Sequence, residues 1–256
     1  MSPFEVIALR AFSDNYIWTI RDAECAAVVD PGDARPVLDY LRRENLRLAA
    51  ILNTHHHADH VGGNSALLRH HRVPVFGPHD PRIAEVTNRL AEGGRMRLPH
   101  FGLEFEVMEI PGHTRTHIAF YGAEMLFCGD TLFAAGCGRL FEGTPQQMHD
   151  SLTKLTRLPD ATRVYCGHEY TLSNIRFAKA ADPNNQALRE LEARARKLRN
   201  KDLPTLPSTI AQEKATNPFL RCAERDVIAT ASKYAGQPLV DPVSVLAALR
   251  EWKNNF

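Results

Sequence analysis

The segment Thr54-His55-His56-His57-Ala58-Asp59-His60 decides how this chain is read. His55 and His57 are two positions apart, so they point to the same side of an extended segment, whereas Asp59 and His60 are adjacent and point elsewhere. The segment follows an apolar run, is not terminal and contains an aspartate, which argues against a tag or a surface tract. We therefore predict that one loop supplies two neighbouring metal ions. Hydrolytic sites of this kind hold a nucleophilic hydroxide between ions about 3.5–4 Å apart.

Three further motifs each place one possible ligand beside a glycine, which lets the backbone turn sharply. They are Pro111-Gly112-His113-Thr114, Phe127-Cys128-Gly129-Asp130-Thr131 and Val164-Tyr165-Cys166-Gly167-His168-Glu169. A lone histidine is more often structural, but three such motifs after apolar segments indicate a complete ligand set.

The ligands divide between two ions. We expect His55, His57 and His113 on the first ion and Asp59, His60 and His168 on the second, with Asp130 bridging both through its two oxygens. Nitrogen and oxygen ligands suit two divalent ions, with Zn favoured and Fe or Mn as alternatives.

Three neighbouring residues are not expected to bind metal. His56 faces away from the ligands on either side of it. Asp30 is read either as a support for a ligating histidine or as the first residue of an Asp-Pro-Gly turn. His117 is read either as a support for the site or as a packed strand residue.

With these residues the chain resembles the metallo-β-lactamase superfamily, and within it the glyoxalase II (hydroxyacylglutathione hydrolase) family. Asp14-Asn15-Tyr16-Ile17-Trp18, Gly138–Thr144, Cys166–Thr171, Asn217–Arg221 and Arg250–Phe256 carry the closer likeness. The resemblance runs from about residue 4 to the last residue. It implies an α/β fold, the αββα sandwich of the superfamily, followed by an all-helical substrate-binding region.

The same resemblance implies the substrate contacts. Arg139, Phe141 and Tyr170 border the peptide of glutathione, and Arg250 and Lys253 supply cations for its glycine carboxylate. Phe141 stands where many relatives have Tyr, so it lacks a hydroxyl that could form a hydrogen bond. Arg250 and Lys253 are three apart and share a helix face. Spacing alone favours the reading in which they complement the negative end of their own helix, and the resemblance reverses this preference.

The implied activity is hydrolysis of S-D-lactoylglutathione and other S-2-hydroxyacylglutathiones to glutathione and a 2-hydroxy acid, D-lactate for the first. This is the second step of methylglyoxal detoxification. The metal-bridging hydroxide is the expected nucleophile, and Asp59 and Asp130 are the expected catalytic carboxylates beside it. A thiolate leaves readily because an unperturbed thiol has a pKa of about 8.5. The alternatives are a lactonase, a β-lactamase-like enzyme or a one-iron persulfide dioxygenase on the same core, or a non-catalytic metal-stabilised interaction domain.

Composition agrees with an ordinary globular protein. The 256 residues are 24% charged and 44% apolar, with a formal net charge of +1, which gives no sign of a nucleic-acid surface. The basic stretch Arg189–Lys201 includes glutamates and is read as a solvated helix face.

Five cysteines without a C-x-x-C pair, and no signal peptide or long apolar run, predict a cytoplasmic protein that does not enter membranes. We expect a monomer.

Short apolar runs predict strands in the first part of the chain, near Val6–Leu9, Tyr16–Ile20, Ala26–Val29, Leu48–Leu52, Phe105–Ile110, His117–Tyr121 and Met125–Cys128. Helices are predicted between them near Ala34–Arg43, Gly62–His71 and Pro145–Leu155. Residues 171–201 predict two helices split at 181–185, and later helices begin near Ile210 and at Pro242. The apolar face of the last helix is predicted at Val243, Leu246, Ala247 and Arg250. We expect a catalytic domain over 1–167 and a helical glutathione-binding domain over 168–256.

Overall fold

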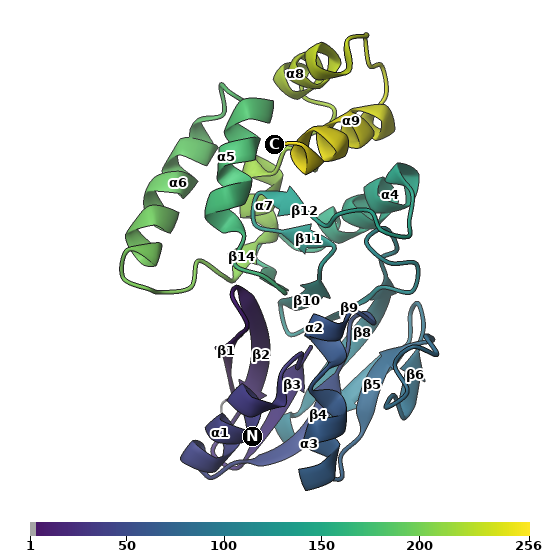
Figure 1. Cartoon of the computed structure of the whole chain (residues 1–256), viewed down its shortest axis with the longest axis vertical. Coiled ribbons are helices and arrows are strands. Elements are labelled where there is room, and N and C mark those ends of the chain that lie inside the picture. The colour runs from purple at the N-terminus through teal and green to yellow at the C-terminus, as the bar shows by residue number, and fades with distance from the viewer. Residues whose placement is uncertain (1–3) are drawn as a thin grey trace. The chain divides into compact units, whose positions relative to one another are not determined.

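Two units make up the fold of residues 4–256, the part of the chain that the computed structural model describes (Figure 1). Unit 1 contains the described residues up to Glu109 together with Thr116–Gly129. Unit 2 contains Ile110–Arg115 and Asp130–Phe256.

Unit 1 contains a six-stranded mixed sheet with the order β1-β2-β3-β4-β5-β6. Its strands are β1 (Glu5–Ala11), β2 (Asn15–Arg21), β3 (Cys25–Val29), β4 (Arg47–Leu52), β5 (Val75–Pro78) and β6 (Asn88–Leu90). Short turns make β1, β2 and β3 antiparallel, whereas β3 to β6 run parallel because helices connect β3 to β4 and β4 to β5. These helices are α1 (Ala34–Glu44), α2 (Ala58–Val61) and α3 (Asn64–His70).

One face of this sheet is covered by α1 and α3. Val37 and Leu41 of α1 and Leu67 of α3 join Ala26 and Val28 of β3 in one buried cluster. Asp33 caps the start of α1 by accepting a hydrogen bond from the Arg35 amide at 2.8 Å. Every residue of β3 is buried, as expected for a strand that is covered on both faces.

The second sheet of unit 1 is an antiparallel meander of β7 (Arg95–Leu98), β8 (Leu103–Glu109), β9 (Ile118–Gly122) and β10 (Met125–Gly129). A short 3₁₀ helix, Pro99–Phe101, joins β7 to β8. Leu103, Phe105 and Val107 of β8 are buried and alternate with more exposed glutamates, which is the pattern of a half-solvated strand. The strands predicted from the sequence in this half of the chain are confirmed.

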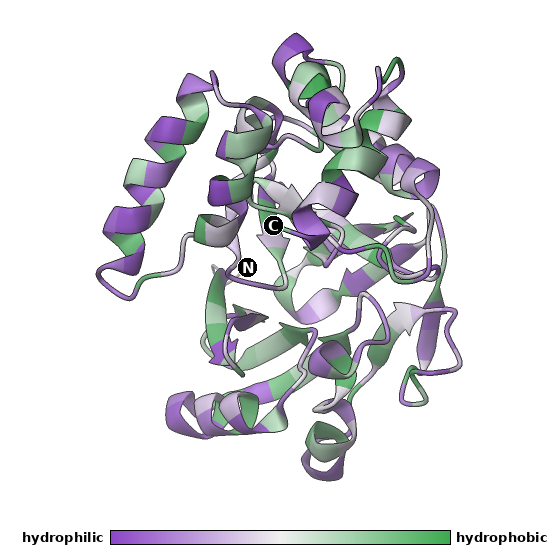
Figure 2. Cartoon of the chain, turned by 45° about the horizontal axis from the view of Figure 1, so that its top comes forward, coloured by the Kyte–Doolittle hydropathy of each residue, from purple (hydrophilic) through white to green (hydrophobic). Residues whose placement is uncertain are grey.

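Unit 2 is mainly helical. Its helices are α4 (Pro145–Thr156), α5 (Thr171–Ala181), α6 (Gln186–Arg199), α7 (Ile210–Thr216), α8 (Arg225–Ala235) and α9 (Pro242–Asn254). Two short antiparallel pairs accompany them, β11 (Leu132–Phe133) with β12 (Gly136–Cys137) and β13 (Arg163–Cys166) with β14 (Ser208–Thr209). Ile175 and Ala178 of α5 pack on Leu188 and Leu191 of α6. The hydrophilic and hydrophobic bands along these helices mark them as amphipathic (Figure 2).

The predicted face of α9 is partly wrong. Leu246 and Arg250 are buried as expected, but Val243 and Ala247 are only half-buried. Val245, Ala248 and Leu249 are buried instead, because the helix covers a wider surface than one narrow stripe. The split between α5 and α6 is confirmed, and the Thr209 hydroxyl caps α7 by accepting a hydrogen bond from the Gln212 amide. Within residues 4–256, no helix is both long and apolar enough to cross a membrane.

Candidate metal centre and substrate site

The histidine-rich loop leaves the end of β4 and enters the short helix α2. His55 and His60 are almost completely buried, whereas His57 and Asp59 are partly exposed. Nε2 of His55 lies 3.2 Å from Nδ1 of His57. Two nitrogen ligands of one tetrahedral zinc-like ion are separated by about 3.3 Å when each bond is near 2.05 Å. The two imidazoles are therefore already spaced as ligands of one ion.

Asp30 supports this loop from the end of β3. Its carboxylate accepts hydrogen bonds from the amide of Thr54 at 2.7 Å, from the hydroxyl of Thr54 at 2.6 Å and from Nδ1 of His60 at 3.0 Å. The backbone of Asp30 has a φ of 52°, and its carbonyl accepts a hydrogen bond from Gly32 in a tight turn. Asp30 is therefore both a turn residue and a hydrogen-bond partner of His60, because the turn places its carboxylate beside that ring.

These contacts define the nitrogens that remain for metal. Asp30 accepts the proton of His60 Nδ1, so Nε2 of His60 is the nitrogen left for a metal ion, and it lies 3.5 Å from Oδ2 of Asp59. The Thr54 hydroxyl donates to Asp30 and lies 3.0 Å from Nδ1 of His55, which leaves Nε2 of His55 directed at His57.

Asn15 orients Asp59, a role that the sequence did not suggest. Its side-chain amide donates to Oδ2 of Asp59 at 3.0 Å and to the Asp59 carbonyl at 3.3 Å. Asn15 is the first residue of β2, more than forty positions from the loop. Its position within Asp14–Trp18, one of the segments behind the family resemblance, was the available signal.

His117 and His56 lie on either side of the ligand loop. The ring of His117 stacks on His55, with centroids 4.6 Å apart and planes inclined by 15°. His117 is fully buried and its Nδ1 donates to the carbonyl of Ile118 at 3.1 Å, so its fixed ring supports that of His55. His56 faces Asp80, with Nδ1 at 3.5 Å from Oδ2, in agreement with its expected orientation away from the ligands.

Gly129 is required beside these rings. Its φ is 48°, and a Cβ there would lie 2.3 Å from the hydroxyl of Thr54 and 2.8 Å from Cε1 of His117. Any other residue would collide with the group that supports His55.

In unit 2, His113, Asp130 and His168 form a second buried group. Nε2 of His168 lies 3.2 Å and Nε2 of His113 lies 3.5 Å from the same oxygen, Oδ2 of Asp130. Nδ1 of His113 donates to the carbonyl of Arg139 at 2.8 Å, which leaves Nε2 for a metal ion. Both ring nitrogens therefore face the same carboxylate oxygen of Asp130.

Three of the expected substrate residues lie against these ligands. The ring of Tyr170 is parallel to that of His168, with centroids 4.7 Å apart. Phe141 is 60% exposed and contacts His113 edge-on at 5.3 Å. The guanidinium of Arg139 lies 5.5 Å from the centroid of the Phe141 ring. The phenyl ring of Phe141 therefore supports Arg139, although it has no hydroxyl.

Arg250 and Lys253 also lie close together, on α9. Arg250 is 6% exposed, and its Nη1 donates to the carbonyl of Cys137 at 2.7 Å rather than to the end of its own helix. Burial and the charges of Arg250 and Arg176 lower the pKa of Lys253 to about 8, although Cys137 opposes this shift. Within residues 4–256, neither cation forms an ion pair with a carboxylate. Buried charge without a counter-charge is costly, so this cluster favours an anion.

A buried clamp holds the turn between β11 and β12, and the sequence did not reveal it. Glu213 accepts a hydrogen bond from the amide of Ala135 at 2.8 Å. The side-chain amide of Asn217 donates to the carbonyls of Phe133 at 3.1 Å and Gly136 at 2.9 Å. Burial raises the pKa of Glu213. The clamped ribbon carries Cys137, the hydrogen-bond acceptor of Arg250.

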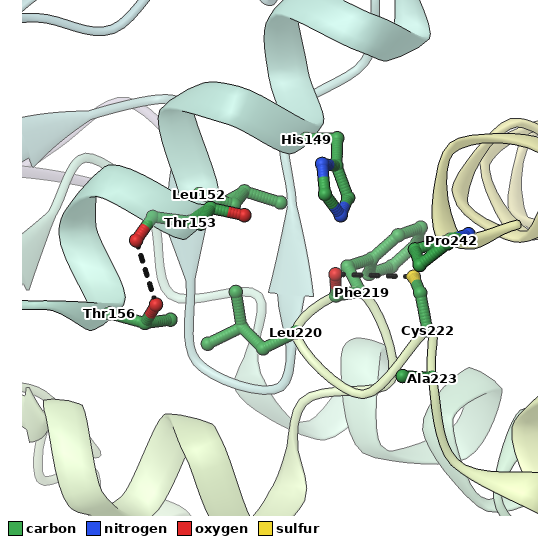
Figure 3. A pocket seen from close by; sticks show the side chains of 9 residues that line it. All are labelled: His149, Leu152, Thr153, Thr156, Phe219, Leu220, Cys222, Ala223 and Pro242. Atoms are coloured by element: carbon green, nitrogen blue, oxygen red, sulfur yellow. Dashed lines mark hydrogen bonds between the residues drawn. The ribbon is translucent and has the colours of Figure 1, made fainter.

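A small pocket of about 110 Å³ in unit 2 is separate from the predicted site residues (Figure 3). Its lining comes from α4, from the loop after α7 and from the start of α9: His149, Leu152, Thr153, Thr156, Phe219, Leu220, Cys222, Ala223 and Pro242. Pockets for small ligands usually measure about 300–1,000 Å³, so this one is too small for a glutathione thioester.

Each unit thus brings together its own share of the predicted residues. Unit 1 holds His55, His57, Asp59 and His60, and unit 2 holds His113, Asp130 and His168 with all five expected substrate residues. The chain carries clusters of histidine and aspartate that are suited to divalent metal ions.

The comparisons with known proteins agree with this chemistry. The metallo-beta-lactamase superfamily model matches residues 12–168, and the model for the hydroxyacylglutathione hydrolase C-terminus matches residues 169–256. A hydroxyacylglutathione hydrolase of Nitrosomonas europaea is 57% identical over 98% of this chain and 96% of its own length. Another from Aeromonas salmonicida is 52% identical over 99% of this chain and 100% of its own length.

Solved structures show the same fold. ETHE1 from Myxococcus xanthus matches with a TM-score of 0.63 and 25% identity over 98% of both chains. The structure of TTHA1623 in a di-iron-bound form matches with a TM-score of 0.59 and 27% identity, over 84% of this chain and 100% of its own. The expected metallo-β-lactamase fold with a C-terminal helical region is confirmed.

Proposed function

Because the chain belongs to the hydroxyacylglutathione hydrolase family within the metallo-β-lactamase superfamily, we propose that it hydrolyses glutathione thioesters, above all S-D-lactoylglutathione. The products are glutathione and D-lactate, or another 2-hydroxy acid from a related thioester. Water adds to the acyl carbon, the carbon–sulfur bond breaks, and the thiolate takes up a proton. The observation that carries the choice of substrate is a pair of cations, the buried Arg250 and the half-buried Lys253, neither of which has a carboxylate partner among residues 4–256.

Seven side chains are proposed to hold two divalent ions. As the sequence pattern predicts, His55, His57 and His113 serve the first ion, Asp59, His60 and His168 serve the second, and Asp130 serves both. Zinc is the first choice and iron or manganese the alternatives. Two such ions would lower the pKa of a shared water towards neutrality and stabilise negative charge on the thioester oxygen. The ring nitrogens that point away from these positions are tied to Asp30, Thr54 and Arg139, which supports this assignment.

The chain's own residues then bind and orient the substrate. Arg250 and Lys253 bind the glycine carboxylate, and Arg139, Phe141 and Tyr170 border the rest of the peptide. Tyr170 and Phe141 contact ligating histidines through their rings, so a peptide bound against them lies beside Asp130 and its neighbours in unit 2. Asp59 and Asp130 are the carboxylates assigned to the reacting water.

We assign catalysis to residues 1–167 and glutathione binding to residues 168–256. All five cysteines are buried thiols outside disulfides, which supports a reducing, cytoplasmic location. The protein is proposed to act as a monomer on a small molecule, without nucleic-acid or membrane partners.

A direct assay tests the function. Purified, metal-analysed protein should hydrolyse S-D-lactoylglutathione and hydrolyse an N-acetylcysteamine thioester of lactate far less efficiently, because the latter lacks the glycine carboxylate. About two metal ions per chain and no oxygen consumption are expected. One iron per chain with oxygen consumption would favour a dioxygenase instead, and equal use of both thioesters would refute the glutathione specificity.

A further inference from the structure

Two phenylalanines form a stacked pair under the two cations of α9. The rings of Phe177 and Phe219 have centroids 5.9 Å apart and planes inclined by 20°. Both side chains are almost completely buried, at 0% and 1% exposure. Phe177 comes from α5, and Phe219 from the loop between α7 and α8.

Each ring faces one cation. The guanidinium carbon of Arg250 lies over Phe219 at 5.3 Å from its centroid, and Nζ of Lys253 lies over Phe177 at 5.2 Å. These distances fall within the range of about 6 Å in which the negative face of an aromatic ring attracts a cation. One cation thus lies over each ring of the stack.

Without these two rings, the two cations would be poorly held in place. Their charges repel, and each long side chain loses rotamer freedom when it is fixed. The carbonyl of Cys137 holds one end of Arg250, but within residues 4–256 Lys253 has neither a hydrogen bond nor an ion pair. The ring of Phe177 is therefore the contact that orients its ammonium group.

We propose that the Phe177–Phe219 pair is a positioning device that sets the spacing of Arg250 and Lys253 for one carboxylate of the substrate. This inference rests on the proposed function, because it deepens the account of how the glycine carboxylate is recognised. Neither ring needs to touch the substrate. A ring that only filled the core would affect stability but would not discriminate between ligands with and without that carboxylate.

The test measures binding of S-methylglutathione, a thioether that cannot be hydrolysed, by calorimetry alongside KM and kcat for S-D-lactoylglutathione. Phe219→Leu should raise Kd and KM about two- to thirtyfold, the range that corresponds to a cation–π contact, and leave kcat unchanged. Phe219→Tyr keeps the aromatic face and should retain affinity. Leu188→Val, at a fully buried position in the α5–α6 core, is the matched control and should bind like the unaltered protein.

Variants that keep the shape of the ring cover the case in which Phe219→Leu does not fold. Mono-, di- and trifluorinated phenylalanine at position 219 or 177 weaken the negative face stepwise, so Kd should rise with each fluorine. The glycine carboxamide of S-methylglutathione should bind all variants alike. A Kd that does not change along the fluorine series, or an equal loss for both ligands, would overturn the positioning role. If the unaltered protein neither binds S-methylglutathione nor hydrolyses the thioester, the proposed function itself fails instead.

Discussion

Asp30 accepts a hydrogen bond from Nδ1 of His60 at 3.0 Å, and this contact determines which nitrogen of the ring is left for a metal ion. The same carboxylate holds the amide and the hydroxyl of Thr54. One side chain at the end of β3 therefore connects the start of the ligand loop to its last histidine. Partners of this kind raise the basicity of a ligating imidazole and fix its orientation.

Asp30→Asn should lower metal affinity and kcat/KM by about ten- to a hundredfold, because an amide cannot accept all three of these hydrogen bonds. Metal content after dialysis, together with the rate on S-D-lactoylglutathione, measures the effect. Asp33→Asn is the matched control, since Asp33 only caps α1 and asparagine caps helices equally well. Full metal retention in Asp30→Asn would show that His60 needs no such support.

Asp130→Ala should abolish turnover and reduce metal content more than any other single ligand substitution. Oδ2 of Asp130 faces both His113 and His168, so its removal leaves two sets of nitrogen ligands without the negative charge between them. Elemental analysis of the folded variant, confirmed by circular dichroism, gives the metal content. Two ions per chain with near-native turnover would contradict the bridging role.

Sequence patterns predicted most of the fold, because the strands and helices of unit 1 have clear periodicity and turn residues. They failed for α8 (Arg225–Ala235), whose N-cap Glu224 forms no side-chain capping bond and which buries only Val227 and Ala231. Sequence patterns did not predict the later strands β5 and β6, because both are short and are stabilised by parallel pairing with strands that are distant in the sequence.

The ligand motifs were visible for a different reason: metal chemistry requires particular side chains at short spacings. The partners that orient these ligands come from far along the chain. Asn15 reaches Asp59, and Asp80 faces His56. Asn217 and Glu213 hold a turn about eighty positions earlier in the sequence. Only folding brings such pairs together, so local patterns in one sequence do not reveal them.

Asn217→Ala should destabilise the protein by about 1–3 kcal/mol, because it leaves the buried carbonyls of Phe133 and Gly136 without their donor. Urea unfolding followed by tryptophan fluorescence measures the loss. Asn184→Ala, which removes an exposed contact to Asp226, is the control and should be nearly neutral. Equal stability of the two variants would mean that the turn between β11 and β12 holds without the clamp.

Arg250→Ala combined with Lys253→Ala should raise KM for S-D-lactoylglutathione about ten- to a hundredfold, since a charge-assisted contact contributes about 1.5–3 kcal/mol. Metal content and the rate on the N-acetylcysteamine thioester should not change. The control pair, Arg225→Ala with Lys233→Ala, removes two exposed cations from α8. An unchanged KM in the first double variant would assign glutathione recognition elsewhere.

The pH dependence of KM should report Lys253. Burial and the neighbouring Arg250 and Arg176 lower its pKa to about 8 from 10.5, although Cys137 opposes them. The side chain is therefore charged at neutral pH and loses its proton as the pH rises through about 8. KM for the glutathione thioester should be flat below that range and rise about tenfold above it.

The same group should affect the free energy of unfolding in the opposite sense. Between about pH 8 and pH 10.5 the unfolded chain binds more protons than the folded chain, so the contribution of Lys253 to stability rises with pH.

The measurement compares kcat/KM for S-D-lactoylglutathione and for the N-acetylcysteamine thioester from about pH 6.5 to about pH 9.5. Their ratio cancels the titration of groups that act on both substrates, because only the glutathione thioester has the carboxylate that meets Lys253. The ratio should fall through about pH 8 in the unaltered protein and stay level in Lys253→Gln. A ratio that falls equally in both proteins would assign the titration to another group, and a level ratio in the unaltered protein would show that the charge of Lys253 does not bind the substrate.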